Sequence, residues 1–197
     1  MIRITDVTLC TIDHRYAQKD LLLRLYKLLL QTGINFIEIN VPILNLLGEK
    51  IEYEKTILRV EHPSDINRYT GFIRYVCRHS GYDVPAGTIS EFQINDVREL
   101  NLLRNLSQYL TVRFVGLDDL LQHDYLNIFE RLKHLSDTQA EFCPQNSYYC
   151  ATALAVEWIL NGGENIAVSF CGSGGFAALE EVMMALRIAK RHKPNLD

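Results

Sequence analysis

The alternation of short apolar runs with longer amphipathic runs constrains the fold of this chain more than any other feature. Between residues 141 and 186 the order is strand, loop, helix, strand, glycine-rich loop and helix. A strand that pairs in parallel with the next needs a crossover connection, which is usually a helix. The pattern therefore predicts βαβ units and an α/β fold, with a parallel sheet that either closes as a barrel or opens as a doubly wound sheet.

The same alternation runs through the rest of the chain. Strands are expected where β-branched and aromatic residues gather, and helices where leucines recur at helical spacing. The expected strands lie at 2–9, 34–42, 56–62, 84–94, 110–116, 140–143 and 165–170, and the expected helices at 19–31, 66–79, 96–108, 120–135, 149–161 and 177–191.

These seven strands fall one short of a complete (β/α) barrel, which has eight strands and usually about 250 residues. The chain has 197 residues and shows no linker or low-complexity segment. We therefore expect a single domain over residues 1–197 with a TIM-barrel-like fold. It is either seven-stranded or incomplete, or its eighth strand is hidden near 84–108.

Composition indicates a globular protein of the cytoplasm. An apolar content of 48%, a charged content of 22% and a net charge of −4 give no basis for binding nucleic acid or an anionic membrane. No apolar run approaches the roughly 20 residues that span a bilayer, and the first residues, MIRITDVTLC, do not read as a signal peptide. The five cysteines, mostly in apolar segments, favour free thiols in a reducing compartment.

Four stretches carry a resemblance to a known family. Residues 5–9, TDVTL, resemble a first strand that reads DTTLRDG, and residues 19–42 resemble the block K…L…G…IE.G.P. Residues 142–166 align without gaps to F-H-x-H-N-D-x-G-x-A…AG, and residues 174–186, GGFAALEEVMMAL, resemble AGNAxLEEVxxxL. These motifs are similar to those of the metal-dependent barrel family of homocitrate synthase, isopropylmalate synthase and hydroxymethylglutaryl-CoA lyase. The resemblance implies a (β/α) barrel, and an acyltransferase or lyase acting on acyl-CoA and 2-oxo acids as the ancestral activity.

The residues that carry the chemistry of that family are replaced in this chain. Family members hold a divalent cation through oxygen and imidazole donors, and the cation polarises the carbonyl of a 2-oxo acid. The resemblance places the family's arginine and metal-ligand aspartate on Cys10 and Thr11. It places the two metal-binding histidines on Cys143 and Gln145, and the metal-ligand asparagine on Phe176. The Asp-Thr pair of the DT.G motif falls on Gly116 and Leu117. We therefore expect the metal-dependent condensation to be lost and no cofactor to be bound.

The loop CGSGG at 171–175 is the first candidate binding site. It lies between an expected strand and the amino end of a helix, where glycine amides and the helix dipole favour an anion. The candidate ligand contacts for a small carboxylate or a phosphorylated molecule are Gly172, Ser173, Gly174, Gly175, Asn146 and Arg113. A turn that serves only tight packing is the alternative for the glycines. Arg113 could instead neutralise one of the glutamates near the strand ends, Glu38, Glu61, Glu91 or Glu141.

Four residues are candidates for catalysis. Glu38 keeps a family position, and Cys143 ends the penultimate strand. Asp13 and His14 follow the first strand, where the family places catalytic residues. The simpler interpretation of Asp13 and His14 is a solvated loop, and that of Glu38 is a buried carboxylate paired with Arg59 or Arg113.

A soft metal site is a further alternative. Cys10, Cys143 and Cys171 each end a strand, and in a closed barrel these strands would be neighbours. Three thiolates, with His14 as a fourth ligand, could hold zinc. Because no CxxC spacing is present, small buried side chains are the favoured interpretation of these cysteines.

Three functions follow from these observations. The favoured one is a non-catalytic or regulatory relative of the family that binds a small carboxylate or phosphorylated ligand, or assembles with a catalytic partner subunit or as a homodimer. The second is an enzyme with redirected chemistry, a metal-independent aldolase, lyase or acyltransferase acting at the barrel mouth. The third is an unrelated α/β barrel to which no function transfers.

Overall fold

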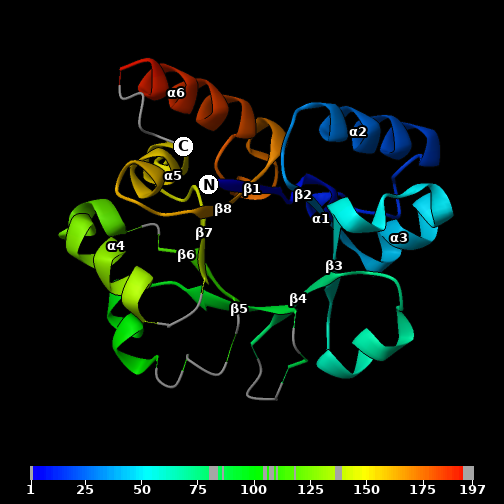
Figure 1. Ribbon diagram of the computed structural model, residues 1–197, viewed down its shortest axis with the longest axis horizontal. Coiled ribbons are helices and arrows are strands. Elements are labelled where there is room, and N and C mark those ends of the chain that lie inside the picture. Colours follow the sequence, from blue (N-terminus) through cyan, green and yellow to red (C-terminus); the bar gives the residue numbers. More distant parts are fainter. Residues whose placement is uncertain are drawn as a thin grey trace.

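The chain forms a closed barrel of eight parallel strands in sequential order (Figure 1). The computed structural model describes residues 2–79, 84–85, 87–103, 106, 109, 111–117, 119–135 and 139–192, without the side chains of 190–192. The strands are β1 (Arg3–Asp6), β2 (Phe36–Asn40), β3 (Thr56–Val60), β4 (Arg74–Arg78), β5 (Thr88–Ile94), β6 (Thr111–Gly116), β7 (Gln139–Pro144) and β8 (Asn165–Val168). β8 pairs with β1 and closes the ring.

The expected TIM-barrel-like fold is confirmed, but the expectation of a seven-stranded or incomplete barrel is wrong. The eighth strand is β4, which lies inside the predicted helix 66–79 and not near 84–108. The helical stretch that begins at Pro63 ends at Arg68, and Gly71, with φ of +109°, lies in the turn that leads into β4. The following run Tyr75–Cys77 is buried on both faces, as a strand in a parallel sheet must be.

The connections between the strands contain both α-helices and short 3-10 helices. The α-helices are α1 (Thr8–Thr11), α2 (Lys19–Gln31), α3 (Val41–Leu47), α4 (Tyr125–His134), α5 (Ala151–Leu160) and α6 (Leu179–His192). The 3-10 helices are η1 (Gly48–Lys50), η2 (Tyr53–Lys55), η3 (Pro63–Arg68), η4 (Val97–Leu102), η6 (Leu120–Gln122) and η7 (Phe170–Gly175).

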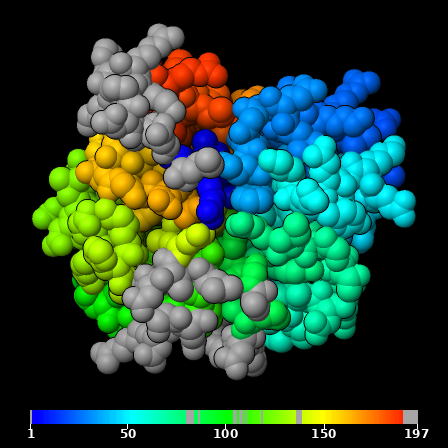
Figure 2. Space-filling view, viewed as in Figure 1, coloured from blue at the N-terminus to red at the C-terminus, as the bar shows by residue number. Residues whose placement is uncertain are grey.

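Two crossovers use short 3-10 helices where a typical barrel has full α-helices. η3 joins β3 to β4, and η4 stands where the helix 96–108 was predicted. Residues 104, 105, 107 and 108 of that predicted helix lie outside the described residues. The α-helices accordingly gather around β7, β8, β1 and β2 (Figure 1). In Figure 2 the start of the chain, in dark blue, lies near the middle of one face between α2 and α5.

The barrel interior is built in layers, because inward side chains alternate along every strand. An apolar layer near the amino ends contains Phe36, Ile57, Val76 and Ile89. Two residues further along the strands, charged side chains point inward at positions such as Arg59 and Glu91. Above them lies a second apolar group, formed by Val7, Val115, Cys143, Ala167 and Phe176. The charged side chains thus lie between two apolar groups along the barrel axis. Across the described residues, no helix is both long and apolar enough to cross a membrane.

Candidate functional site

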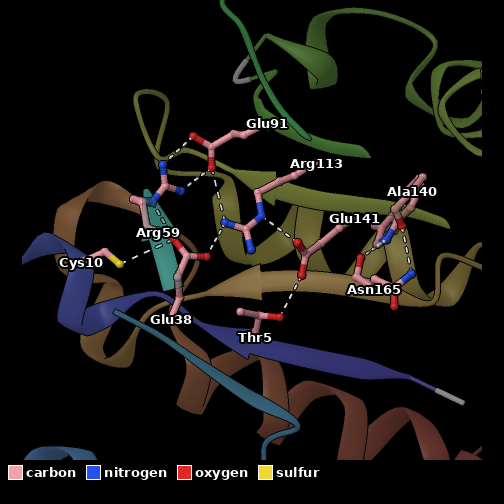
Figure 3. A network of polar contacts seen from close by, with 10 residues as sticks. Thr5, Cys10, Glu38, Arg59, Glu91, Arg113, Ala140, Glu141 and Asn165 are labelled. Carbon is pink, nitrogen blue, oxygen red and sulfur yellow. Dashed lines mark hydrogen bonds and ion pairs between the residues drawn. The ribbon is translucent and has the colours of Figure 1, made fainter. Parts of the chain in front are cut away.

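Five ionisable side chains from five strands meet in the middle of the barrel (Figure 3). We refer to Glu38, Arg59, Glu91, Arg113 and Glu141 as the charged layer. Arg113 is its centre: Nη1 donates to Glu38 Oε2 at 2.6 Å and to Glu91 Oε2 at 3.3 Å, while Nε donates to Glu141 Oε2 at 2.7 Å. The side chain of Arg113 is 0% exposed. Pairing with three carboxylates is what allows this guanidinium to be buried.

Arg59 completes the charged layer on the side that solvent reaches. Its Nε donates to Glu38 Oε1 at 2.6 Å, and its two terminal nitrogens bind the two oxygens of Glu91. The Arg59 side chain is 26% exposed. Thr5 Oγ1 donates to Glu141 Oε1 at 2.8 Å on the opposite side. The layer is therefore tied to β1 at one end and opens to solvent at the other.

These contacts decide the protonation of the glutamates. Burial alone would raise the pKa of Glu38, but Arg113 and Arg59 outweigh it and hold the pKa at about 2. The same guanidiniums lower the pKa of Glu91 against the opposing effect of burial. A carboxylate with so low a pKa is a poor general base at neutral pH, since the best catalytic pKa lies near the working pH. The structure thus places Glu38 in the paired arrangement that was the alternative to catalysis.

The positions of the family's metal ligands come together at the carboxyl ends of the strands. Phe176 packs with Cys143 in the upper apolar group and forms an antiparallel bridge with Gln145. A Cβ built on Gly174 would lie 2.5 Å from Thr11 Cγ2 and 3.2 Å from the Phe176 ring, so Thr11 borders the same place. Four positions from three segments that are far apart in sequence therefore converge, as the resemblance implies.

The side chains at these positions do not fit a hard divalent cation. Phe176 offers no donor atom. Thr11 Oγ1 already donates to Thr8 O at 2.8 Å and lies 2.6 Å from Ser173 Oγ. Burial raises the pKa of Cys143 far above its usual range, so this thiol stays protonated. In the ranges that the structure describes, no group of three or more His, Cys, Asp or Glu side chains could hold a metal ion.

The three cysteines of the proposed soft metal site lie in different surroundings. Cys10 Sγ donates to Glu38 Oε1 at 3.5 Å, Cys143 is buried in the upper apolar group, and Cys171 is exposed. Burial and the neighbouring Glu38 charge raise the pKa of Cys10 well above its usual range. Because a thiolate is the reactive form, neither Cys10 nor Cys143 is activated as a nucleophile.

The glycine loop is η7, and the chain itself supplies a carboxylate to it. Cys171 N donates to Glu180 Oε2 at 3.0 Å, from the first turn of α6. Ser169 Oγ donates to Ser173 O at 2.7 Å. Gly172, Gly174 and Gly175 all have positive φ. The clash that a side chain at Gly174 would make with Thr11 shows that tight packing accounts for at least this glycine.

The remaining candidates lie on loops and at helix starts. Asp13 and His14 are exposed, and Asp13 pairs with Arg15 at 2.7 Å. Hydrogen bonds from Arg15 hold the pKa of Asp13 at about 2. Asn146 Oδ1 accepts from Ala151 N at 3.1 Å and so bonds the first turn of α5. The solvated-loop interpretation of Asp13 and His14 matches these positions.

Two features were missed by the sequence analysis. The first is Asp6, which is fully buried and whose carboxylate accepts from Thr8 N at 3.0 Å and Thr8 Oγ1 at 2.9 Å. Burial raises its pKa to about 6 despite these bonds. Thr8 Oγ1 also accepts from Phe170 N at 2.6 Å, which links the end of β1 to the glycine loop. The motif TDVTL contains this residue, but its burial could not be read from the motif.

The second feature is a pocket of about 650 Å³ at the carboxyl ends of β5, β6 and β7. Its lining includes Asn95, which directly follows β5, Gly116, which is the last residue of β6, and Gln145, which directly follows β7. We refer to it as the mouth pocket. Its size is typical of small-molecule sites, which in barrels of this type lie at this end. Gly116 and Gln145 occupy positions of the family's chemical residues, so the mouth pocket adjoins the place where the ancestral site is expected.

Comparison with known proteins agrees with the resemblance seen in the sequence. The chain is 28% identical over 184 residues to the homocitrate synthase omega subunit of Clostridium pasteurianum, a match that covers 82% of this chain and 51% of that protein. The chain therefore spans about half the length of this curated relative. No family model matches the sequence.

Solved structures share the fold at low identity. Hydroxymethylglutaryl-CoA lyase from Pseudomonas aeruginosa superposes with a TM-score of 0.75 at 12% identity, over 96% of this chain and 86% of that one. The HMG-CoA lyase of Bacillus subtilis gives a TM-score of 0.71 at 14% identity, over 95% and 86%. These comparisons confirm the resemblance to the homocitrate synthase and hydroxymethylglutaryl-CoA lyase barrels.

Proposed function

We propose that this homocitrate synthase-like barrel is a binding or partner subunit that has lost the metal-dependent condensation of its relatives. The observation that carries the proposal is the place of Phe176. Its ring packs against Cys143 and its backbone bridges to Gln145, where the ligands of a family member would converge. A hydroxyl, a thiol, an amide and a phenyl ring replace the carboxylate, imidazole and amide donors that a hard cation requires.

The charged layer supports the same proposal. An active site in a barrel mouth usually holds groups with pKa values matched to proton transfer. Here the glutamates are bonded to Arg59 and Arg113, and the pKa of Glu38 is held at about 2. The layer is consistent with a structural role in filling the barrel. Both of its cations are paired with carboxylates of the chain itself, and within the described residues Nη2 of Arg113 is the one guanidinium nitrogen of the layer that is buried without a hydrogen-bond partner.

The relative from Clostridium pasteurianum supports assembly with other chains. That protein is described as an omega subunit, and we propose that this chain likewise acts in association with a second polypeptide or a second copy of itself. Analytical ultracentrifugation of the purified chain, alone and with its candidate partners, tests this part of the proposal.

A metal-independent lyase or aldolase is the second candidate, and Asp6 is the observation that favours it. A carboxyl with a pKa of about 6 exchanges its proton near neutral pH, which is the property of a general acid or base. Against it, the Asp6 side chain is fully buried and both its oxygens are bonded to Thr8.

The test is an activity assay on the full chain. Purified protein is incubated in two separate reactions, each with and without Mn²⁺ or Mg²⁺. With acetyl-CoA and 2-oxoglutarate the release of free CoA thiol is measured, and with hydroxymethylglutaryl-CoA the release of acetoacetate is measured, because cleavage leaves the CoA thioester intact. We expect no release above the background without enzyme. Release that requires the metal would overturn the proposal, and release that is independent of metal but abolished by Asp6→Asn would establish the second candidate.

A further inference from the structure

The charges that line the mouth pocket are already paired. Arg98 donates through Nε to both carboxylate oxygens of Asp96 at 2.9 Å, and its own backbone N bonds Asp96 Oδ1 at 2.7 Å. His123 Nε2 lies 3.3 Å from Asp119 Oδ2. Arg98 and His123 are the two basic side chains among the described lining residues. An anion entering the pocket would therefore have to compete with a carboxylate for either of them.

The balance of charge also disfavours an anion. Asp96 and Asp119 face one guanidinium, so the pocket carries a net negative charge when His123 is neutral. Hydrogen bonds from Arg98 hold the pKa of Asp96 at about 2, so this carboxylate stays ionised at all physiological pH values. A carboxylate or phosphate ligand would meet repulsion here and no free cation to offset it.

Three other lining residues carry uncharged polar groups that are open to a ligand. The side-chain amide of Gln122 and the hydroxyls of Ser147 and Tyr148 have no hydrogen-bond partner within the part of the chain that the structure describes. Tyr148 is 57% exposed, so much of this aromatic residue is accessible at the pocket. Amides and hydroxyls both donate and accept hydrogen bonds, and a carboxylate accepts them.

We propose that the mouth pocket binds an uncharged molecule bearing several hydroxyl groups, of the size of a monosaccharide or cyclic polyol. Hydroxyl groups donate to Asp96 and Asp119 and exchange hydrogen bonds with Gln122 and Ser147. The apolar side of a sugar-like ring packs on Tyr148. This inference rests on the proposed binding function and names its ligand class, replacing the small anion that the glycine loop suggested.

The test is saturation-transfer difference NMR on the full chain with two matched sets of probes. One set contains D-ribose, D-glucose and myo-inositol, and the other contains malonate, 2-oxoglutarate and citrate. We expect saturation transfer to at least one polyol and weaker or no transfer to the carboxylates. Tyr148→Ala should weaken polyol binding roughly tenfold or more, because the ring face is lost.

Tyr149→Ala is the matched control, because Tyr149 is 90% exposed and does not line the pocket. It should leave polyol affinity unchanged. Gln122→Ala provides a second pocket variant should Tyr148→Ala fail to fold. Binding of the carboxylates in preference to the polyols, or the absence of polyol binding at tens of millimolar, overturns the inference. Neither result bears on the metal-dependent assay, so failure here is distinguishable from failure of the proposed function.

Discussion

Arg113 Nη1 lies 2.6 Å from Glu38 Oε2 at the centre of the barrel, and neither side chain has any exposed surface. This contact joins β6 to β2 across the interior. It identifies Glu38, the one candidate catalytic carboxylate that keeps its family position, as part of an internal ion-pair network. The charged layer should therefore contribute mainly to the stability of the fold. Substitutions in the layer should change the free energy of unfolding.

Replacing Arg113 with methionine should unfold the barrel readily. Three buried glutamates would lose their central partner, and removing one member of a buried ion pair costs about 3–5 kcal/mol. Urea denaturation followed by circular dichroism measures the loss. Arg15→Met is the control, because its pair with Asp13 is exposed, and it should leave the free energy of unfolding unchanged. Equal stability of the two variants would contradict the central role of Arg113.

Acid should destabilise the protein through Glu38. Its pKa in the folded state, about 2, lies below the ordinary value of 4.5. A depressed pKa contributes stability that is present above the unfolded value and is lost as the pH falls toward 2. The free energy of unfolding should therefore decrease between pH 5 and pH 2, a range that denaturation curves at fixed pH would cover. A flat profile in this window would show that the pairing is absent in solution.

Asp6 should change the pH dependence of the free energy of unfolding in the opposite direction to Glu38. Its pKa rises from 3.8 to about 6 on folding, so its contribution is present below pH 3.8 and is lost as the pH rises through 6. The stability of Asp6→Asn relative to the wild type should rise across this window by up to ~3 kcal/mol. Parallel stability curves for the two proteins between pH 4 and pH 8 would refute the raised pKa.

Packing at the glycine loop can be tested by a pair of substitutions. Gly174→Ala places a Cβ 2.5 Å from Thr11 Cγ2 at a φ of +71°, whereas Gly175→Ala, at +76°, meets open space. Both should lose about 1 kcal/mol from the backbone conformation, and Gly174→Ala should lose a further ~1–3 kcal/mol from overpacking. Thr11→Ser removes Cγ2 and should restore part of the extra loss, as thermal melts would show. If the two alanine variants melt alike, Thr11 does not pack on this loop.

Cys171 and Cys143 should react with a thiol reagent at different rates. Cys171 is exposed and Cys143 is buried with a strongly raised pKa, so a thiol reagent should modify Cys171 early and Cys143 only on unfolding. Labelling with Ellman's reagent followed by peptide mass mapping orders the sites, and Cys171→Ser should abolish the earliest labelling. Rapid modification of Cys143 in the native protein would revive it as a candidate nucleophile.

The barrel was predictable from the sequence, because strand and helix periodicities and the family motifs agree over most of the chain. β4 could not be predicted from the sequence. Its five residues lie in the run 66–79, which follows Ser64 and Asp65, two residues that could cap a helix, and which also suits a helix. The pairing of Glu38 with Arg59 and Arg113 was one of two alternatives, and only the register of β2, β3 and β6 decides between them. The mouth pocket could not be foreseen, since it depends on loops after three strands meeting in space.

Binding of Mn²⁺ tests the central claim most directly. Isothermal titration calorimetry of the full chain, with a catalytically active homocitrate synthase measured in parallel, reports whether the mouth can hold the family's cation. The donors at Thr11, Cys143, Gln145 and Phe176 predict no stoichiometric binding at millimolar Mn²⁺. Stoichiometric binding that is lost in Gln145→Ala would contradict the account and restore metal-dependent chemistry to this barrel.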